Sequence, residues 1–223
     1  MKPNQPEPPI SAKALFKYFL QEFKRMHGVD FIQNPETMGN LLPLIYYFAK
    51  DKRFFECQNL RTDIIKYPSF DKGLFIMGNY GIGKTNYLKV FEEMFKKYYP
   101  HRFKIISTKD IVREYECCQT PNDKDYYYKK MYGGKLALDD TGSERKANNF
   151  GSNETLIEIL ETRCDRGLIT HLTSNYAEGC EYDVAESLLA MNIRYGGRVY
   201  DRIFENFNII EFKGKSMRGN IKR

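Results

Sequence analysis

The chain has 223 residues, of which 42% are hydrophobic, 29% are charged and 15% are aromatic. This length fits one domain of ordinary size with a short appendage, and the composition excludes a wholly disordered chain. The formal net charge of +6 favours polyanionic partners, although a lysine-rich surface facing solvent is the simpler explanation.

Cysteine usage and the first residues exclude further classes. The five cysteines are odd in number and include no Cys-x-x-Cys pair, so we expect neither a disulfide framework nor a zinc ribbon. The polar, proline-rich start is not a signal peptide, and no apolar run approaches the roughly 20 residues of a membrane span. We therefore expect a cytoplasmic protein that does not associate with a membrane.

The chain divides into three expected parts. Prolines predict an extended, disordered tail at residues 1–10. Amphipathic helical patterns predict an N-terminal module at residues 11–67. The main domain is then expected at residues 68–223.

Two helices are predicted in the N-terminal module. Ser11 is expected to cap the first, which ends at Gly28. The second covers about residues 36–55 and contains Pro43, which predicts a kink or a boundary at that point.

Strands and helices alternate from residue 68 onward. The five expected strands are residues 74–77, 103–107, 136–138, 168–173 and 208–212. The expected helices are residues 84–98, 153–166 and 185–202, with a long helical and polar stretch between the second and third strands. This alternation predicts an α/β fold of three layers, in which helices cover both faces of a parallel five-stranded sheet.

A glycine-rich loop lies between the first strand and the helix after it. Its residues are Gly78, Asn79, Tyr80, Gly81, Ile82, Gly83, Lys84 and Thr85, and Asn86 follows. The three glycines are expected to adopt unusual dihedral angles and to bring backbone N–H groups against phosphate oxygens. Lys84 would contact the β- and γ-phosphates, and the Thr85 hydroxyl would bind Mg²⁺. The sequence therefore predicts a site for ATP and Mg²⁺. The alternative is a glycine turn followed by a surface lysine.

Polar residues follow two later strands. Asp139 and Asp140 end the third strand, where Asp139 is expected in the Mg²⁺ shell and Asp140 as the base that orients an attacking water. The alternative is an ordinary Asx-turn at a strand end. Asn175 follows the fourth strand and is a candidate for holding that water, although Ser-Asn is also a common strand exit.

The order of these motifs resembles the AAA+ helicase-loader group of the DnaC/DnaI type, and IstB-type transposition helper ATPases share it. The resemblance covers about residues 68–218. It is carried by the glycine-rich loop of residues 78–85, named the phosphate loop for this resemblance, and by the segments 138–144, 172–175, 195–203 and 212–218. It implies an AAA+ domain that hydrolyses Mg-ATP, with Asp139 and Asp140 as the Walker B pair and Asn175 as sensor 1.

The resemblance also assigns two arginines and an oligomer. Arg202 matches the arginine finger that enters the site of a neighbouring subunit, and Arg218 matches the sensor 2 arginine. Arg198, one turn before Arg202, is a second candidate for the finger. A surface salt bridge is the alternative for Arg202 and for Arg218. A homo-oligomer with ATP sites at its subunit interfaces is therefore implied.

Basic and aromatic residues alternate between the second and third strands. The candidates for contacting single-stranded DNA are Lys109, Arg113, Tyr126, Tyr127, Lys129 and Lys130. Basic side chains can follow a phosphate backbone while aromatic rings stack on unpaired bases. In the resembled group an extra helix in this region lines a DNA channel. The alternative is a solvated face with tyrosines packed beneath it.

Three functions remain open at this stage. The first is an ATP-driven loader of a replicative helicase on single-stranded DNA. The second is a transposition helper that serves a transposase. The third, of another class, is a small-molecule kinase. The N-terminal module matches neither the zinc-bearing domain of DnaI nor the helicase-binding segment of DnaC, so the protein partner stays open.

Overall fold

A parallel sheet of five strands forms the centre of the computed structural model, which describes residues 10–149 and 151–217. The strands are β1 (Gly73–Gly78), β2 (Phe103–Ser107), β3 (Lys135–Asp139), β6 (Thr170–Ser174) and β7 (Phe207–Phe212), in the order β2-β3-β6-β1-β7. Two short antiparallel strands, β4 (Ala147–Asn148) and β5 (Ser152–Asn153), form a separate hairpin. Residues 1–9 of the expected tail and residues 218–223 lie outside the described residues.

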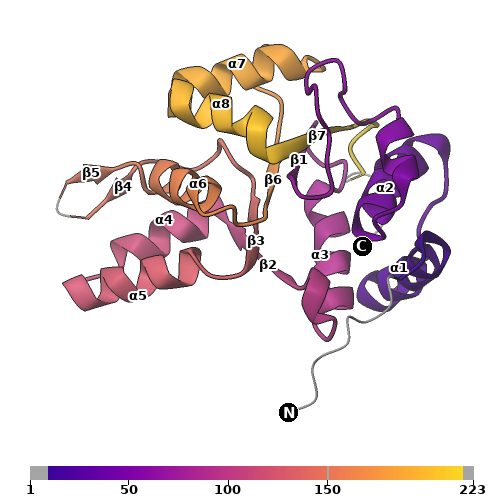
Figure 1. Ribbon diagram of the computed structural model, residues 1–223, viewed down its shortest axis with the longest axis horizontal. Coiled ribbons are helices and arrows are strands. Elements are labelled where there is room, and N and C mark those ends of the chain that lie inside the picture. The colour runs from indigo at the N-terminus through magenta and orange to yellow at the C-terminus, as the bar shows by residue number, and fades with distance from the viewer. Residues whose placement is uncertain (1–9, 150, 218–223) are drawn as a thin grey trace.

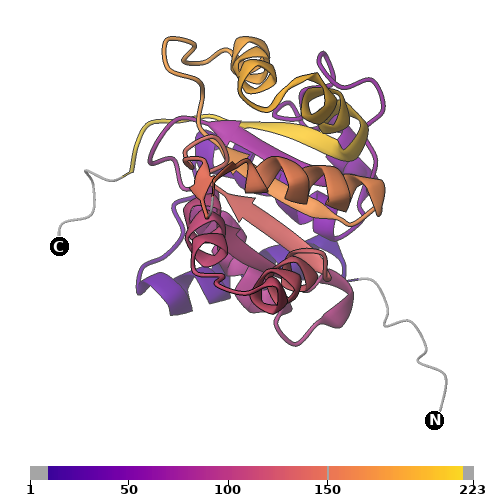
Figure 2. The ribbon, with the colours of Figure 1, turned by 90° about the vertical axis from the view of Figure 1, so that its left-hand side faces the viewer.

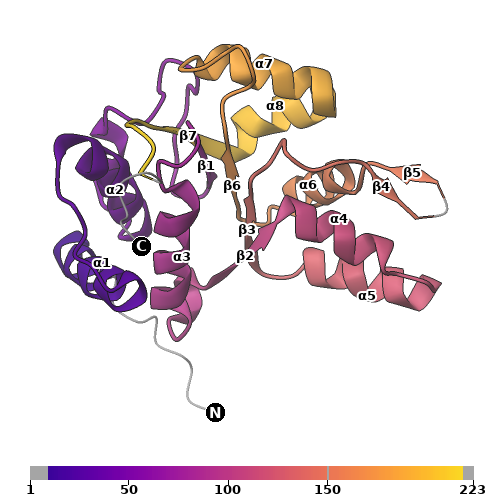
Figure 3. The same ribbon diagram turned by 180° about the vertical axis from the view of Figure 1, so that it is seen from behind.

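Helices cover both faces of the sheet. The α-helices are α1 (Ala12–His27), α2 (Pro35–Phe48), α3 (Lys84–Phe95), α4 (Thr108–Glu116), α5 (Pro121–Met131), α6 (Thr155–Asp165), α7 (Val184–Tyr195) and α8 (Gly197–Asn206), and the 3₁₀ helices are η1 (Lys52–Glu56) and η2 (Tyr99–His101). Figures 1 and 3 show α1, α2 and α3 together on one side of the sheet, with α4 to α8 on the other. Figure 2 looks onto the second of these sides, where α7 and α8 lie toward the β7 edge of the sheet and α4 and α5 toward the β2 edge. The predicted fold class is confirmed.

The central strands are buried because both faces of the sheet are covered. Every residue of β1, β6 and β7 is buried. The sequence of β1 is apolar, as is typical of a strand between two helical layers. The strand β6 is mostly polar, and its buried polar side chains are hydrogen-bonded instead. All neighbouring strands of the sheet run parallel, so their carboxyl ends meet at one edge.

The first helix has the predicted ends, but the second does not. The Ser11 side chain accepts a hydrogen bond from the N–H of Ala14, and Gly28 ends α1 in the left-handed conformation. The helix predicted to reach about residue 55 ends at Phe48, and η1 follows as a separate element. Of the kink or boundary predicted at Pro43, the boundary is wrong, because α2 continues through Pro43. Proline removes one backbone hydrogen bond, and the burial of its apolar neighbours on this face of α2 offsets that loss.

The N-terminal helices share one hydrophobic core with the sheet domain. The ring of Phe19 on α1 lies 5.1 Å from that of Phe91 on α3, and the ring of Phe48 on α2 lies 4.7 Å from it. Leu60 pairs with Ile210 of β7 through an isolated β-bridge. The helix that follows the phosphate loop is therefore packed from two sides, by the sheet and by α1 with α2. Within the described part of the chain, no helix combines the length and apolarity needed to cross a membrane.

A buried histidine joins the two central strands. His171 of β6 is 1% exposed, and its Nδ1 accepts a hydrogen bond of 3.1 Å from the N–H of Leu74 on β1. Rings of Tyr47, Phe48 and Phe103 surround it. Burial, with smaller contributions from nearby cationic side chains, lowers the pKa of His171 to about 3. The folded protein therefore holds this imidazole neutral.

Replacing this histidine is expected to reduce the loss of unfolding free energy that occurs as the pH falls below 7. As the pH falls from about 6.5 toward 3, the unfolded chain binds a proton at His171 that the folded chain excludes, so the folded state loses stability. In His171→Asn an amide oxygen can still accept the Leu74 hydrogen bond. Between pH 7 and pH 4, the free energy of unfolding should fall by about 3 kcal/mol less in the variant than in the wild type.

Chemical denaturation at a series of pH values measures this difference. His101, whose burial lowers its pKa to about 4, contributes to both proteins equally. His27→Asn on the exposed end of α1 is the control for replacing a histidine outside the core. If the free energy of unfolding of His171→Asn depends on pH as it does in the wild type, the conclusion that the folded protein holds His171 neutral is wrong.

Candidate nucleotide-binding site

The glycine-rich loop connects the carboxyl end of β1 to the first turn of α3. Gly81 and Gly83 have φ angles of 76° and 96°, in the left-handed region that favours glycine, as predicted. Gly78 has no such angle, so the predicted reason for its glycine is wrong. A β-carbon there would lie 2.5 Å from the carbonyl oxygen of Phe212, because β7 runs directly beside it. Ile82 is buried and anchors the loop, whereas Tyr80 is exposed.

The ammonium group of Lys84 lies at the centre of the site. Its Nζ donates to the carbonyl oxygens of Gly78 (2.7 Å) and Asn79 (2.9 Å) and to Oδ1 of Asn175 (2.8 Å). Gly83 precedes α3 without a side-chain cap, so an anion can approach the first N–H groups and the positive end of the helix dipole. The predicted lysine and the predicted asparagine are therefore in direct contact.

Two oxygen donors lie where a divalent cation is expected. The Thr85 hydroxyl donates to Oδ1 of Asp139 at 2.8 Å. A hydroxyl and a carboxylate are ligands that Mg²⁺ prefers, and Mg²⁺ usually completes its shell with water and phosphate oxygens. Thr85 and Asp139 therefore fit the predicted role of holding Mg²⁺.

Asp140 and Asn175 form the remaining part of the network. Nδ2 of Asn175 donates to Oδ1 of Asp140 at 2.9 Å, so this amide bridges the Asp140 carboxylate and the Lys84 ammonium. Asp140 has a φ of 62°, which turns the chain sharply at the end of β3. The other oxygen, Oδ2, accepts a hydrogen bond of 2.9 Å from the Ser143 hydroxyl, and the carboxylate as a whole is 38% exposed. Such a group can orient a water molecule and accept its proton.

Sequence reasoning missed Thr173. This buried residue of β6 donates through Oγ1 to Oδ1 of Asp139 (2.6 Å), and the same oxygen accepts from the backbone N–H of Asp140 (2.9 Å). It therefore orients both members of the acidic pair. The available signal was a hydroxyl two residues before Asn175 at the end of the neighbouring strand.

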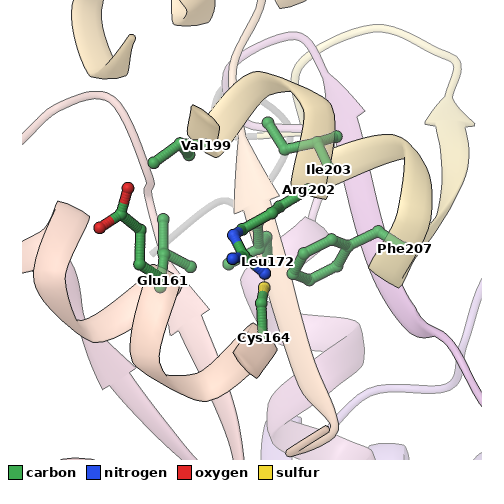
Figure 4. A pocket seen from close by; sticks show the side chains of 8 residues that line it. Glu161, Cys164, Leu172, Val199, Arg202, Ile203 and Phe207 are labelled. Carbon is green, nitrogen blue, oxygen red and sulfur yellow. The ribbon is translucent and has the colours of Figure 1, made fainter. Parts of the chain in front are cut away.

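Arg202 lies away from this network within the same chain. Its Nη2 is 2.5 Å from Oδ1 of Asp165 on α6, its side chain is 25% exposed, and its buried Nε has no hydrogen-bond partner. Figure 4 shows the side chain extending from α8 toward Cys164, beside a small apolar cavity of about 10 Å³. The salt bridge considered as the alternative for Arg202 is therefore present.

The other two predicted arginines differ from Arg202. Arg198 on the same helix is 75% exposed, and its Nε is 3.7 Å from Oε1 of Glu161. Arg218 lies outside the described residues. The structure brings Lys84, Thr85 and the acidic pair together with Asn175, but it does not join Arg198 or Arg202 to them within one chain.

The proposed DNA contacts lie on α4 and α5. Tyr127 is 3% exposed, and its hydroxyl donates to the carbonyl of Ile111. Its ring is covered, so the prediction that it stacks on bases is wrong for this conformation. Tyr126 is 74% exposed.

The basic candidates on these helices are paired with carboxylates. The pairs are Arg113 with Asp110, Lys129 with Asp125, Lys130 with Glu114, and Lys109 with Asp140. The last pair, at 3.7 Å, places Lys109 beside the candidate nucleotide site rather than on a separate DNA surface.

No family model matches this chain, and no curated protein sequence matches it. Solved structures do match. The DnaC helicase loader is 22% identical over 82% of this chain and 93% of that chain, with a TM-score of 0.54. A protein described as a primosome component of Streptococcus pyogenes serotype M3 is 20% identical over 84% and 85% of the two chains, also with a TM-score of 0.54.

A third similar structure is domain III of the replication initiation protein DnaA from Thermotoga maritima. It is 15% identical over 88% of this chain and 67% of that chain, with a TM-score of 0.50. At these identities the comparison establishes the fold. The predicted resemblance to DnaC-type AAA+ domains is thus confirmed at the level of the fold.

Enlarging Gly78 tests the close packing of the phosphate loop. In Gly78→Ala the new methyl group would lie 2.5 Å from the Phe212 carbonyl and 2.6 Å from Cδ1 of Ile82. Either β7 or the loop must shift, so the free energy of unfolding should fall by about 1–3 kcal/mol. Gly133→Ala is the matched control, because its methyl group meets its nearest neighbour at 3.4 Å, an ordinary contact. Equal denaturation midpoints for the two variants would refute the packing argument.

Proposed function

We propose that this chain is an AAA+ ATPase that binds and hydrolyses Mg-ATP in an oligomer and acts on single-stranded DNA, as a loader of a replicative helicase. One observation carries the proposal. Lys84, Asn175 and Asp140 form a continuous hydrogen-bonded network beside the Thr85–Asp139 pair, at the carboxyl edge of β1, β3 and β6. This arrangement supports hydrolysis of a bound triphosphate.

Each group has a distinct chemical role in the proposed reaction. The Lys84 ammonium, held by two loop carbonyls and an amide, offers its charge to the phosphates. Thr85 and Asp139 would hold Mg²⁺, which when bound neutralises charge on the β- and γ-phosphates. Asp140 orients a water and takes up its proton, while Asn175 keeps that carboxylate in place.

The loader role rests on two supports beyond the site. The ordered motifs resemble the DnaC/DnaI group, and the fold is shared with a structure of the DnaC helicase loader. A transposition helper would use the same site, so the protein partner separates these two possibilities. A small-molecule kinase is less well supported, because Asp140 and Asn175 are arranged for attack by water.

Mixing two inactive variants tests the sites shared between subunits. Lys84→Ala should abolish ATP binding, whereas Arg202→Ala should retain binding and lose about 10³-fold or more in hydrolysis. A mixture of the two should regain activity, because a Lys84→Ala subunit still supplies Arg202 to the intact loop of its neighbour. Phosphate release in the presence and absence of single-stranded DNA is the measurement.

Two controls make this test specific. A chain that carries both Lys84→Ala and Arg202→Ala, mixed with the Arg202→Ala variant, should not restore ATP hydrolysis. Arg198→Ala on the same helix shows which arginine acts between subunits. A phosphate transferred to a nucleoside or metabolite, with no effect of DNA, would overturn the proposal. Affinity capture with a Lys84 or Asp140 variant arrested in its ATP-bound state distinguishes a helicase from a transposase as the partner.

Removing the Thr173 hydroxyl should weaken the response to Mg²⁺. Thr173→Val deprives the Asp139 carboxylate and the Asp140 N–H of a shared partner. We expect the Mg²⁺ concentration for half-maximal hydrolysis to rise about tenfold. Thr170→Val is the matched control. It removes a buried hydroxyl at the other end of β6 that accepts from Arg163, and it should lower stability without changing the Mg²⁺ response. Equal shifts in both variants would argue against an orienting role for Thr173.

A further inference from the structure

A short segment after β7 contacts the phosphate loop. This segment, residues 213–217, is named here the C-terminal strap. The backbone N–H of Met217 donates to the carbonyl oxygen of Gly81 at 3.0 Å. A β-carbon on Gly83 would lie 3.9 Å from the methyl group of Met217, so the strap also adjoins the start of α3. The strap therefore contacts the glycine-rich loop at Gly81 and adjoins the residue that precedes α3.

Asn40 of α2 holds the other end of the strap. Its Nδ2 donates to the carbonyl oxygen of Lys213 at 2.8 Å, and its Oδ1 accepts from the Lys213 N–H at 2.9 Å. One side chain thus satisfies both backbone groups of one residue, as a neighbouring strand would. Nδ2 of Asn59 donates to the same Oδ1 at 3.0 Å and fixes the orientation of the amide.

Packing alone does not explain an asparagine at this position. Asn40 is 1% exposed, and Leu41, Leu44 and Ile45 on the same helix are buried apolar residues. Burying an amide costs free energy unless its groups are hydrogen-bonded, and here the groups that satisfy it belong to the strap and to Asn59. The polar side chain therefore serves the attachment of the strap.

The same helix also lies close to the residue that follows Lys213. Gly214 has a φ of 127°, which lets the strap turn immediately after Lys213. A β-carbon on Gly214 would lie 3.1 Å from Oε2 of Glu36 in the first turn of α2. The strap is therefore positioned by α2 on one side and contacts the phosphate loop on the other.

We propose that Asn40 is a positioning residue for the nucleotide site. By anchoring Lys213 it holds the C-terminal strap against the Gly81 carbonyl, so the N-terminal helices set how tightly the phosphate loop binds ATP. This inference rests on the proposed function, because it needs ATP as the ligand. It assigns to α2 a part in nucleotide binding in addition to its place in the core.

The test compares two buried asparagines. Asn40 of α2 lies beside the carboxyl end of β7, and Asn208 lies within β7 near its other end. In Asn40→Ala the dissociation constant and the KM for Mg-ATP should rise about tenfold, while kcat stays within about twofold. Asn208→Ala is the matched control. Asn208 is fully buried, donates to the Ser69 carbonyl at 2.7 Å and accepts from the Ser69 N–H at 2.9 Å, at the end of β7 far from the loop. Both variants should lose thermal stability, but only Asn40→Ala should lose ATP affinity.

Calorimetric titration with Mg-ATP and steady-state hydrolysis decide the outcome. If Asn40→Ala binds as tightly as Asn208→Ala, the positioning role is wrong and the proposed function stands. If the wild type binds no Mg-ATP, the proposed function itself fails. Should Asn40→Ala not fold, Gly214→Ala is the second variant. Gly214 is a partly exposed residue of the strap, and the added methyl group should displace the strap from α2, so that the same comparison with Asn208→Ala applies.

Discussion

The ammonium group of Lys84 connects parts of the chain that are far apart in sequence. It binds two carbonyls of the phosphate loop and the side chain of Asn175, which in turn binds Asp140. These contacts exist only because β3, β6 and β1 are adjacent and parallel, so that their carboxyl ends lie at one edge. Parallel pairing is therefore the constraint on which the candidate site depends.

A rigid core keeps that edge in place. The helix that begins at Lys84 is packed by rings of α1 and α2 on one side and by the sheet on the other. Interiors packed to crystal density transmit small displacements, so a change in the N-terminal helices reaches the loop through contacts such as Asn40 with Lys213. The N-terminal helices are thus part of the machinery that shapes the site as well as part of the fold.

Local patterns accounted for much of the fold. The strand predicted at residues 103–107 matches β2, and the cap at Ser11 and the stop at Gly28 are as expected, because each depends on neighbouring residues alone. A kink or a boundary was predicted at Pro43, and no boundary is present there because burial of the surrounding face outweighs one lost hydrogen bond. The ring of Tyr127, a candidate for stacking on bases, is buried, in agreement with the alternative of tyrosines packed beneath a solvated face.

The sequence by itself determined which residues form the glycine-rich loop, the acidic pair of Asp139 and Asp140, and Asn175, since residue types and places at strand ends are local properties. Only the tertiary structure decided which distant groups they meet. The Thr173 hydroxyl lies between the two aspartates because β6 is the neighbour of β3, and Arg202 pairs with Asp165 because α8 packs on α6. Asn40 reaches the strap because α2 lies beside the end of β7. Contacts between segments follow from strand order and layer packing, which no single stretch of sequence encodes.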